Sequence, residues 1–251
     1  MSMDATPAPT EVGQEKKRRG TLTFLRDVVI IVLIALVVSF AVKTFLVRSF
    51  YIPSASMENT LMEQDRILVD ELTPRFGGYD RGDVVVFRDP GGWLGVSATL
   101  EAPMNPFAAA VDWVLSLVGL TASDSDDHLI KRIIGLPGDH VVCCNELGQI
   151  TVNGTAIDET SYLLLPEPGA AASAIDFDVT VPEGSLWVLG DNRYRSKDSR
   201  YNQEQPGKGF VPLENVVGRA FIVTWPFDRF GLIDSHHPVF AGVPATETAA
   251  P

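Results

Sequence analysis

Residues 127–139 read DHLIKRIIGLPGD and carry the pattern that recurs along most of the chain. Period-two alternation in this stretch places residues 129, 131 and 133 on one face of a β-strand and the residues between them on the other face. The Pro137-Gly138 pair that follows suits the centre of a type II turn. The stretch therefore predicts a strand that ends in a tight turn.

Similar short runs, rich in Val, Ile and Phe and bounded by Gly, Pro, Asp or Asn, follow one another from residue 66 onward. They predict strands at 66–72, 84–88, 128–134, 140–143, 149–152, 177–181, 186–189 and 216–224. Asn153-Gly154 is typical of a type I′ hairpin. Because no βαβ rhythm is present, we expect a mainly β, antiparallel domain over 48–237 with coiled or barrel-like sheets.

The N-terminal part has a different composition. Basic residues gather at 16–19, and residues 28–47 are mostly apolar with Lys43 as the one charged residue, which can extend toward lipid headgroups. This predicts a transmembrane anchor over 21–47, a disordered cytoplasmic tail over 1–20 and an extracytoplasmic domain, because positive residues stay inside. A cleaved secretory signal, cut near Ala41, is the alternative.

The overall charge excludes one class of function. The 251 residues carry a formal charge of −12 with a pI near 4.7, so attraction to the phosphate backbone of nucleic acid has no support. Two cysteines, Cys143 and Cys144, are neighbours and exclude a disulfide scaffold. On a strand they face opposite sides, and a vicinal disulfide is the other possibility.

Two further segments lie outside the strand pattern. Residues 90–127 form an insertion with a short apolar helix between 105 and 120, which either packs on the sheet or dips into one leaflet of a membrane. The last segment, 238–251, is rich in Ala, Thr and Pro, and we expect it to be disordered.

The candidate chemistry lies in two segments. Residues 51–61, YIPSASMENTL, place Ser54 and Ser56 shortly after the apolar segment. Lys131 stands between aliphatic side chains on its strand, and burial of an ammonium lowers its pKa toward the range of a general base. A serine with a lysine is an accepted nucleophile and base pair. The four histidines show no metal-ligand spacing, so neither a metal nor a cofactor is expected.

At these residues the chain resembles bacterial signal peptidase I, the membrane-bound serine endopeptidase that removes signal peptides from exported proteins. Four segments match that family in order. They are PSASM at 53–57 with Thr60-Leu61, GDVVVF at 82–87, KRIIGLPGD at 131–139, and GDNR at 190–193 continued by Ser196, Asp198, Ser199 and Arg200.

The resemblance implies a role for each of these residues. It makes Ser56 the nucleophile, Lys131 the general base and Ser54 an oxyanion donor together with the Ser56 N–H. Supporting positions are also implied: Ser196 would hydrogen-bond the lysine amine, Asp198 and Arg200 would stiffen that loop or form an ordinary surface ion pair, and Ile52, Pro53 and Ile130 would line the substrate pockets. Asn59 and Tyr194-Arg195 depart from the family pattern without touching the proposed dyad.

These expectations combine into one functional prediction. We expect cleavage of preprotein signal peptides at the bilayer after Ala-x-Ala-like sites, with no nucleic acid and no obligate protein partner. A specialised signal peptidase with one dedicated client is an alternative. So are a membrane-tethered β domain that binds without cutting and a self-cleaving Ser-Lys peptidase of the repressor type. The last acts in the cytosol and needs no membrane segment.

Overall fold

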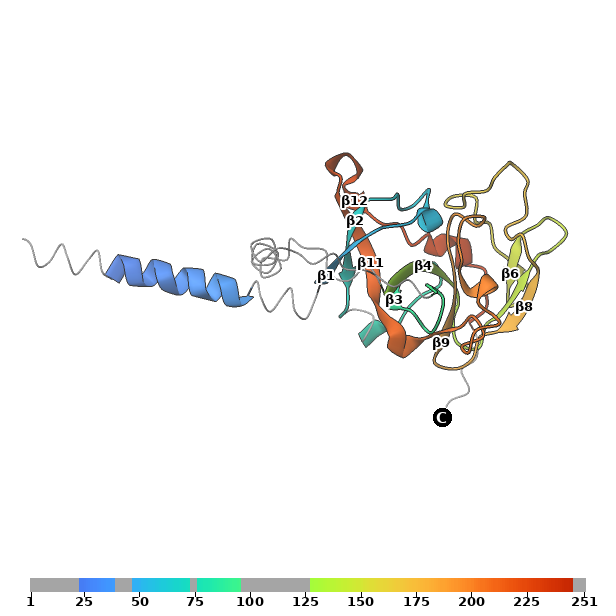
Figure 1. Cartoon of the computed structure of the whole chain (residues 1–251), viewed down its shortest axis with the longest axis horizontal. Helices are drawn as coiled ribbons and strands as arrows, with labels where there is room; N and C mark the ends of the chain where they lie inside the picture. Colours follow the sequence, from blue (N-terminus) through green and yellow to red (C-terminus); the bar gives the residue numbers. More distant parts are fainter. Residues whose placement is uncertain (1–22, 39–46, 73–75, 96–126, 246–251) are drawn as a thin grey trace, which may run out of the picture. The chain divides into compact units, whose positions relative to one another are not determined.

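The computed structural model describes residues 23–38, 47–72, 76–95 and 127–245 (Figure 1). The chain divides into two units, Met1–Lys43 and Thr44–Pro251, which are described separately below.

The first unit contains an α-helix over residues 23–38, within the predicted anchor. Its aliphatic side chains are exposed on every side, with no amphipathic stripe. Among the described residues, none of the helices has both the length and the apolar character needed to span a bilayer. The predicted anchor also covers 39–46, and these residues, like the predicted tail 1–20, lie outside the described part. Its last residue, Val47, begins a strand instead.

The second unit is mainly β, as the alternation predicted. Its described strands are β1 (Val47–Tyr51), β2 (Arg66–Asp70), β3 (Val84–Arg88), β4 (His128–Gly135), β5 (His140–Cys143), β6 (Ile150–Val152), β7 (Thr155–Ala156), β8 (Phe177–Thr180), β9 (Ser185–Leu189), β10 (Val211–Pro212), β11 (Val216–Trp225) and β12 (Gly231–Leu232). Five short 3-10 helices are described between them: η1 (Ala55–Met57), η2 (Ser199–Tyr201), η3 (Leu213–Asn215), η4 (Phe227–Arg229) and η5 (His237–Phe240).

The strands form two antiparallel sheets. The larger follows the order β1-β2-β11-β3-β4-β9-β10, with β12 paired to β11, and the smaller follows β7-β6-β5-β8. The order of the large sheet ends at β1 and β10, so this sheet is open. The barrel-like closure suggested from the sequence is therefore absent among the described strands, where the chain forms two separate sheets.

All eight predicted strands are present, which confirms the antiparallel β reading of the sequence. The predicted hairpin at Asn153-Gly154 joins β6 to β7, and both residues have the positive φ of a type I′ turn. Gly138 has a φ of 84°, as the second central position of a type II turn requires. Cys143 and Cys144 form a vicinal disulfide, one of the two states that the sequence left open.

Three apolar clusters hold the second unit together. One includes Trp187 between the small sheet and the end of the large one, and the other two lie around Ile130 and Ile133, whose side chains point to opposite faces of β4. Phe240 and Val243 are also buried in the first cluster. The prediction of a disordered tail from 238 is therefore wrong for these residues, because their two apolar side chains pack into the core.

The predicted insertion begins later than expected. Trp93 is buried, and its ring packs edge-on against Phe87 at a centroid distance of 5.6 Å. Asp89 accepts backbone hydrogen bonds from Gly91, Trp93 and Leu94, which lower the pKa of its carboxyl group against the opposing effect of burial. Residues 90–95 thus belong to the packed domain. The predicted apolar helix at 105–120 lies outside the described residues.

Candidate active site

The turn that carries Ser56 follows directly from β1. The ring of Pro53 disfavours a helical Ile52, so the chain stays extended through Ser54, whose φ and ψ are −136° and 154°. The 3-10 helix η1 then begins, and it buries Ser56 and Met57. Backbone hydrogen bonds from Ile52 N to Asp65 O and from Gln64 N to Ile52 O, both 2.9 Å, hold the entry to this turn.

Lys131 reaches this turn from the middle of β4. Its Nζ donates hydrogen bonds to Ser56 Oγ at 2.8 Å and to the carbonyl oxygen of Ile130 at 2.7 Å. The side chain is only 3% exposed, and desolvation lowers the pKa of the amine from 10.5 to about 8, although the charges of Asp198 and Asp191 act in the opposite direction. An amine with this pKa can accept a proton from a serine hydroxyl near neutral pH.

The two remaining serines differ from each other. Ser54 Oγ lies 3.3 Å from Ser56 Oγ and is exposed, so it stands beside the residue that the sequence predicts as the nucleophile. Ser196 Oγ is buried and has no hydrogen-bond partner among the described residues. The predicted bond from Ser196 to the lysine amine is therefore not formed, because Lys131 uses the Ile130 carbonyl instead.

Asp198 and Arg200 form a fully buried ion pair, which excludes the surface pair considered from the sequence. Arg200 Nη2 lies 2.7 Å from Asp198 Oδ2, and Asp198 also accepts a bond from Gly190 N at 3.0 Å. Arg200 donates further to the carbonyl oxygen of Arg193 at 2.8 Å. The pair thus fixes the loop 190–200 beside the lysine.

The loop that follows β9 supports Ser56 in a way the sequence did not predict. Asn192 N donates to the carbonyl oxygen of Ser56 at 3.1 Å, and Asn192 Nδ2 donates to Glu58 at 2.7 Å. Gly190 lies so close to the turn that a Cβ there would overlap the Ser56 carbonyl oxygen and the Ser196 hydroxyl. The GDNR signal was recognised in the sequence, but its contacts with the serine turn cross more than 130 residues.

Two further buried ion pairs lie around this loop. Arg132 binds Asp191 through two hydrogen bonds of 2.9 and 2.8 Å, and neither side chain is exposed. Arg193 pairs with Glu159, which also accepts a bond of 2.6 Å from the hydroxyl of Tyr162. No sequence signal connects Glu159 with this site, because it stands in an irregular polar stretch.

A shallow apolar cleft lies next to Ser56 and Lys131. Ile52, Pro53 and Ile130, the three residues predicted to line substrate pockets, border this same cleft. Phe50, Tyr51, Val86, His128 and Leu129 complete its lining. A larger cavity of about 830 Å³, lined among others by Tyr79 and Leu136, contains none of the predicted site residues.

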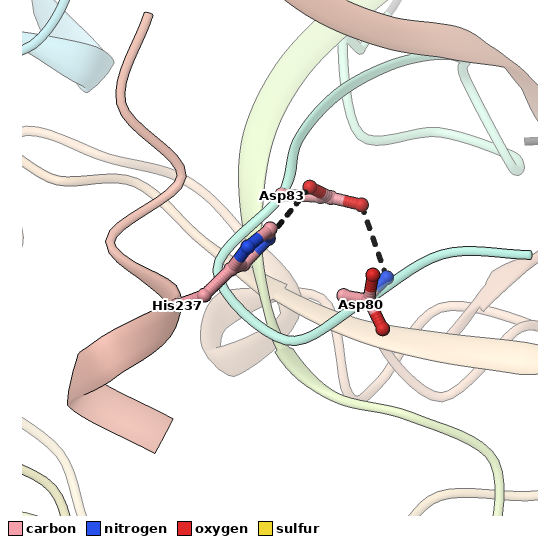
Figure 2. A group of neighbouring side chains, drawn as sticks. All are labelled: Asp80, Asp83 and His237. Carbon is pink, nitrogen blue, oxygen red and sulfur yellow. Dashed lines mark hydrogen bonds and ion pairs between the residues drawn. The ribbon is translucent and has the colours of Figure 1, made fainter. Parts of the chain in front are cut away.

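One group of described side chains has ligand atoms close enough for a metal ion: Asp80, Asp83 and His237 (Figure 2). The carboxylate of Asp83 already accepts hydrogen bonds from Asp80 N at 3.0 Å and from Ser235 Oγ at 3.1 Å, and His237 Nε2 lies 3.1 Å away. These contacts account for the group as a hydrogen-bonded polar cluster, so we assign no metal to it.

Comparison with known proteins identifies the family. The family model described as "Signal peptidase, peptidase S26" matches residues 25–225. The chain belongs to the S26 family of signal peptidases. This confirms the resemblance drawn from the four sequence segments, and all of the predicted site residues of this S26 chain lie within the matched region.

Curated relatives agree with this membership. Signal peptidase I of Mycobacterium tuberculosis H37Rv is 37% identical over 255 residues, which cover 94% of this S26 chain and 83% of the relative. Signal peptidase I U of Bacillus subtilis is 30% identical, and the match covers 84% of this chain and 92% of that relative. A crystal structure of a signal peptidase I from Enterococcus faecalis also matches. The match covers 56% of this chain and 95% of the chain in that crystal structure, at 24% identity and a TM-score of 0.33.

Proposed function

We propose that this chain is a membrane-bound serine endopeptidase that removes signal peptides from exported preproteins, with Ser56 as nucleophile and Lys131 as general base. The observation that carries this proposal is the 2.8 Å hydrogen bond between Lys131 Nζ and Ser56 Oγ, made by an amine whose pKa is about 8. Arginine or an exposed lysine would not serve, because neither loses its proton near neutral pH.

The proposed reaction proceeds in two halves. Ser56 Oγ attacks the carbonyl carbon before the scissile bond while its proton moves to Lys131 Nζ, and the oxyanion accepts hydrogen bonds from Ser56 N–H and the Ser54 hydroxyl. The ammonium then protonates the leaving amine, so the mature protein departs and an acyl-enzyme remains. Lys131 next takes a proton from the water that attacks the acyl-enzyme. Transfer of this proton from Lys131 to Ser56 Oγ releases the cleaved signal peptide and restores the enzyme.

The cleft beside the dyad supports a preference for small side chains. Its lining is mainly apolar and its free volume is about 20 Å³, which leaves room for roughly one water-sized group. We propose that an extended signal peptide binds along residues 50–53 and 128–130, with alanine side chains before the cut. This pocket size supports the proposal of cleavage after Ala-x-Ala sites.

Two features support a position at the outer face of a bilayer. The apolar run 28–47 supplies an anchor in the proposed topology, with the N-terminus in the cytoplasm, and Ser56 lies only nine positions after Val47, a link of at most about 30 Å. Exposed apolar side chains also gather from the end of β11 through β12, where Trp225 lies opposite Arg66, the partner of Tyr51. They are Trp225, Phe227, Phe230 and Leu232, which are 47–81% exposed.

The test is cleavage of a model preprotein by the purified full-length protein in detergent, with N-terminal sequencing of the product. Wild type should release a product that begins after an Ala-x-Ala site, and Ser56→Ala should fold normally and release none. If the preprotein stays intact with wild type, the chain binds without cutting or serves a dedicated client, and the proposal of a general signal peptidase fails. If Ser54→Ala stops turnover while Ser56→Ala does not, the two serines are assigned the wrong way round.

A further inference from the structure

Glu58 stands two residues after Ser56, at the end of the 3-10 helix η1, and its carboxylate contacts the loop that follows β9. Glu58 Oε2 accepts a hydrogen bond of 2.7 Å from Asn192 Nδ2. Asn192 is 4% exposed, and its backbone N–H donates to the carbonyl oxygen of Ser56 at 3.1 Å. Asn192 therefore binds the serine turn at two points, and one of them is on Ser56 itself.

The bond from Asn192 N to the Ser56 carbonyl oxygen fixes the orientation of Ser56 on its C-terminal side. If this carbonyl group turned, the side chain of Ser56 would turn with it, and Oγ would leave its 2.8 Å contact with Lys131 Nζ. The Oγ and the N–H of Ser56 are the groups proposed to act on the carbonyl group of the substrate. A small rotation of Ser56 would therefore slow the reaction.

The side-chain amide of Asn192 depends on Glu58. Among the described residues, Glu58 Oε2 is the acceptor that the structure shows for Asn192 Nδ2. A short hydrogen bond to a carboxylate is of the stronger, charge-assisted kind, and a buried amide without an acceptor is unfavourable. Loss of the carboxylate would therefore favour a shift of Asn192 away from the turn and toward water.

The other partner of Glu58 contributes little to this arrangement. Arg195 Nη1 lies 3.4 Å from the same carboxylate oxygen, and the Arg195 side chain is 66% exposed. Exposed ion pairs of this kind add little stability. The carboxylate thus matters as an acceptor for the amide of Asn192. Glutamine at position 58 would keep this contact, because its side-chain carbonyl oxygen is also an acceptor.

We propose that Glu58 is a positioning residue for the cleavage reaction: it holds Asn192, and Asn192 holds Ser56 in the orientation needed for attack. This inference rests on the proposed peptidase function and adds a residue that acts through another, without contact with the substrate. Glu58 acts on the nucleophile and does not border the cleft along residues 50–53 and 128–130. Its loss should therefore lower kcat and leave KM unchanged.

The test measures kcat and KM for cleavage of one preprotein by the full-length protein in detergent. We expect Glu58→Ala to lower kcat about tenfold, the loss typical of one hydrogen bond to a charged group, with KM unchanged. Glu58→Gln should keep most of the wild-type kcat. Glu63→Ala removes an exposed carboxylate five residues further along, and Arg195→Ala removes the exposed ion pair. Both are controls and should leave kcat unchanged.

A second variant tests the same contact from the other side. Asn192→Ala removes the amide and leaves no buried donor unpaired, and it should lower kcat to a similar extent. If Glu58 acts through Asn192, the double variant should be no slower than Asn192→Ala alone, because the two residues form one unit. Losses that multiply in the double variant would overturn the proposal. If Glu58→Ala does not fold, Asn192→Ala and Glu58→Gln still decide the question.

The remaining outcomes separate the role of Glu58 from the peptidase function. A wild-type kcat in Glu58→Ala or in Asn192→Ala would overturn the positioning role. So would a loss that appears in KM, or a Glu58→Gln protein as slow as Glu58→Ala. Cleavage by wild type and its absence in Ser56→Ala report on the peptidase function independently. If wild type leaves the preprotein intact, the proposed function fails first.

Discussion

Replacement of Lys131 with methionine tests whether the amine lies in an environment as dry as the structure indicates. The pKa of Lys131 is about 8 in place of 10.5, mainly because burial penalises the ammonium. At ~1.36 kcal/mol for each pKa unit, the charged lysine costs the folded state about 3 kcal/mol. Methionine has a similar length and no charge, so Lys131→Met should unfold less readily than wild type at neutral pH.

The stability advantage of Lys131→Met over wild type should become smaller as the pH rises. At about pH 7 the lysine is protonated in the folded and the unfolded chain, so the full cost applies. Between about pH 8 and 10.5 the folded protein has released the proton while the unfolded chain still binds it, so wild-type stability rises with pH. The advantage of Lys131→Met should fall from about 3 kcal/mol at pH 7 to about 1 kcal/mol at pH 9.5.

Urea unfolding of the full-length protein in detergent, followed by tryptophan fluorescence, measures this difference because Trp93 and Trp187 are both buried. Changes in packing contribute equally at both pH values, so the decisive quantity is the narrowing of the gap by about 2 kcal/mol. Lys197→Met, at an exposed lysine, is the control and should show no such narrowing. A gap that stays constant between about pH 7 and 9.5 would refute the lowered pKa.

Two further predictions concern turnover. First, kcat/KM for a preprotein should rise about tenfold per pH unit up to about pH 8 and then level off. Lys131→Arg should be inactive over the same pH range. A kcat/KM that is independent of pH between about 6 and 9 would contradict this prediction. Second, Gly190→Ala should reduce cleavage on the order of a hundredfold, because the new Cβ displaces the Ser56 carbonyl and the Ser196 hydroxyl, whereas Gly231→Ala meets open space. Equal activity of the two glycine variants in a preprotein assay would show that the turn tolerates the displacement.

The strands that were predicted from the sequence are those whose apolar side chains pack into a core on one face or on both. β3, β4 and β5 begin where the sequence placed them, since each has a clear apolar face. β1 was missed because its first residue continues the apolar run before it, and β10 and β12 were missed because two-residue strands carry no periodicity. Their pairing depends on partners elsewhere in the chain.

The residues of the candidate site also divide into those that the sequence could predict and those that it could not. Lys131 could be selected because a lysine between aliphatic residues is chemically unusual, and Ser56 was selected through the four segments that resemble signal peptidase I. The support from Asn192 and the pairing of Arg193 with Glu159 could not be selected, because they join segments distant in sequence through single polar contacts. Local patterns reveal a residue whose own neighbours are unusual, and they do not reveal which loop will be folded against it.

The charges around Ser56 and Lys131 explain why the lysine, and not another buried cation, has the lowered pKa. Four cationic side chains are buried among the described residues, and three of them form ion pairs with buried carboxylates. The pairs are Arg132 with Asp191, Arg193 with Glu159, and Arg200 with Asp198. Each nearby carboxylate is thus already neutralised by an arginine, so Lys131 has only a hydroxyl and a carbonyl oxygen as hydrogen-bond partners in the described structure. Its ammonium is desolvated without a counterion of its own, and an arginine cannot release a proton in its place. The three arginine pairs therefore hold the loop rigid and leave the lysine as the group that can exchange a proton with Ser56.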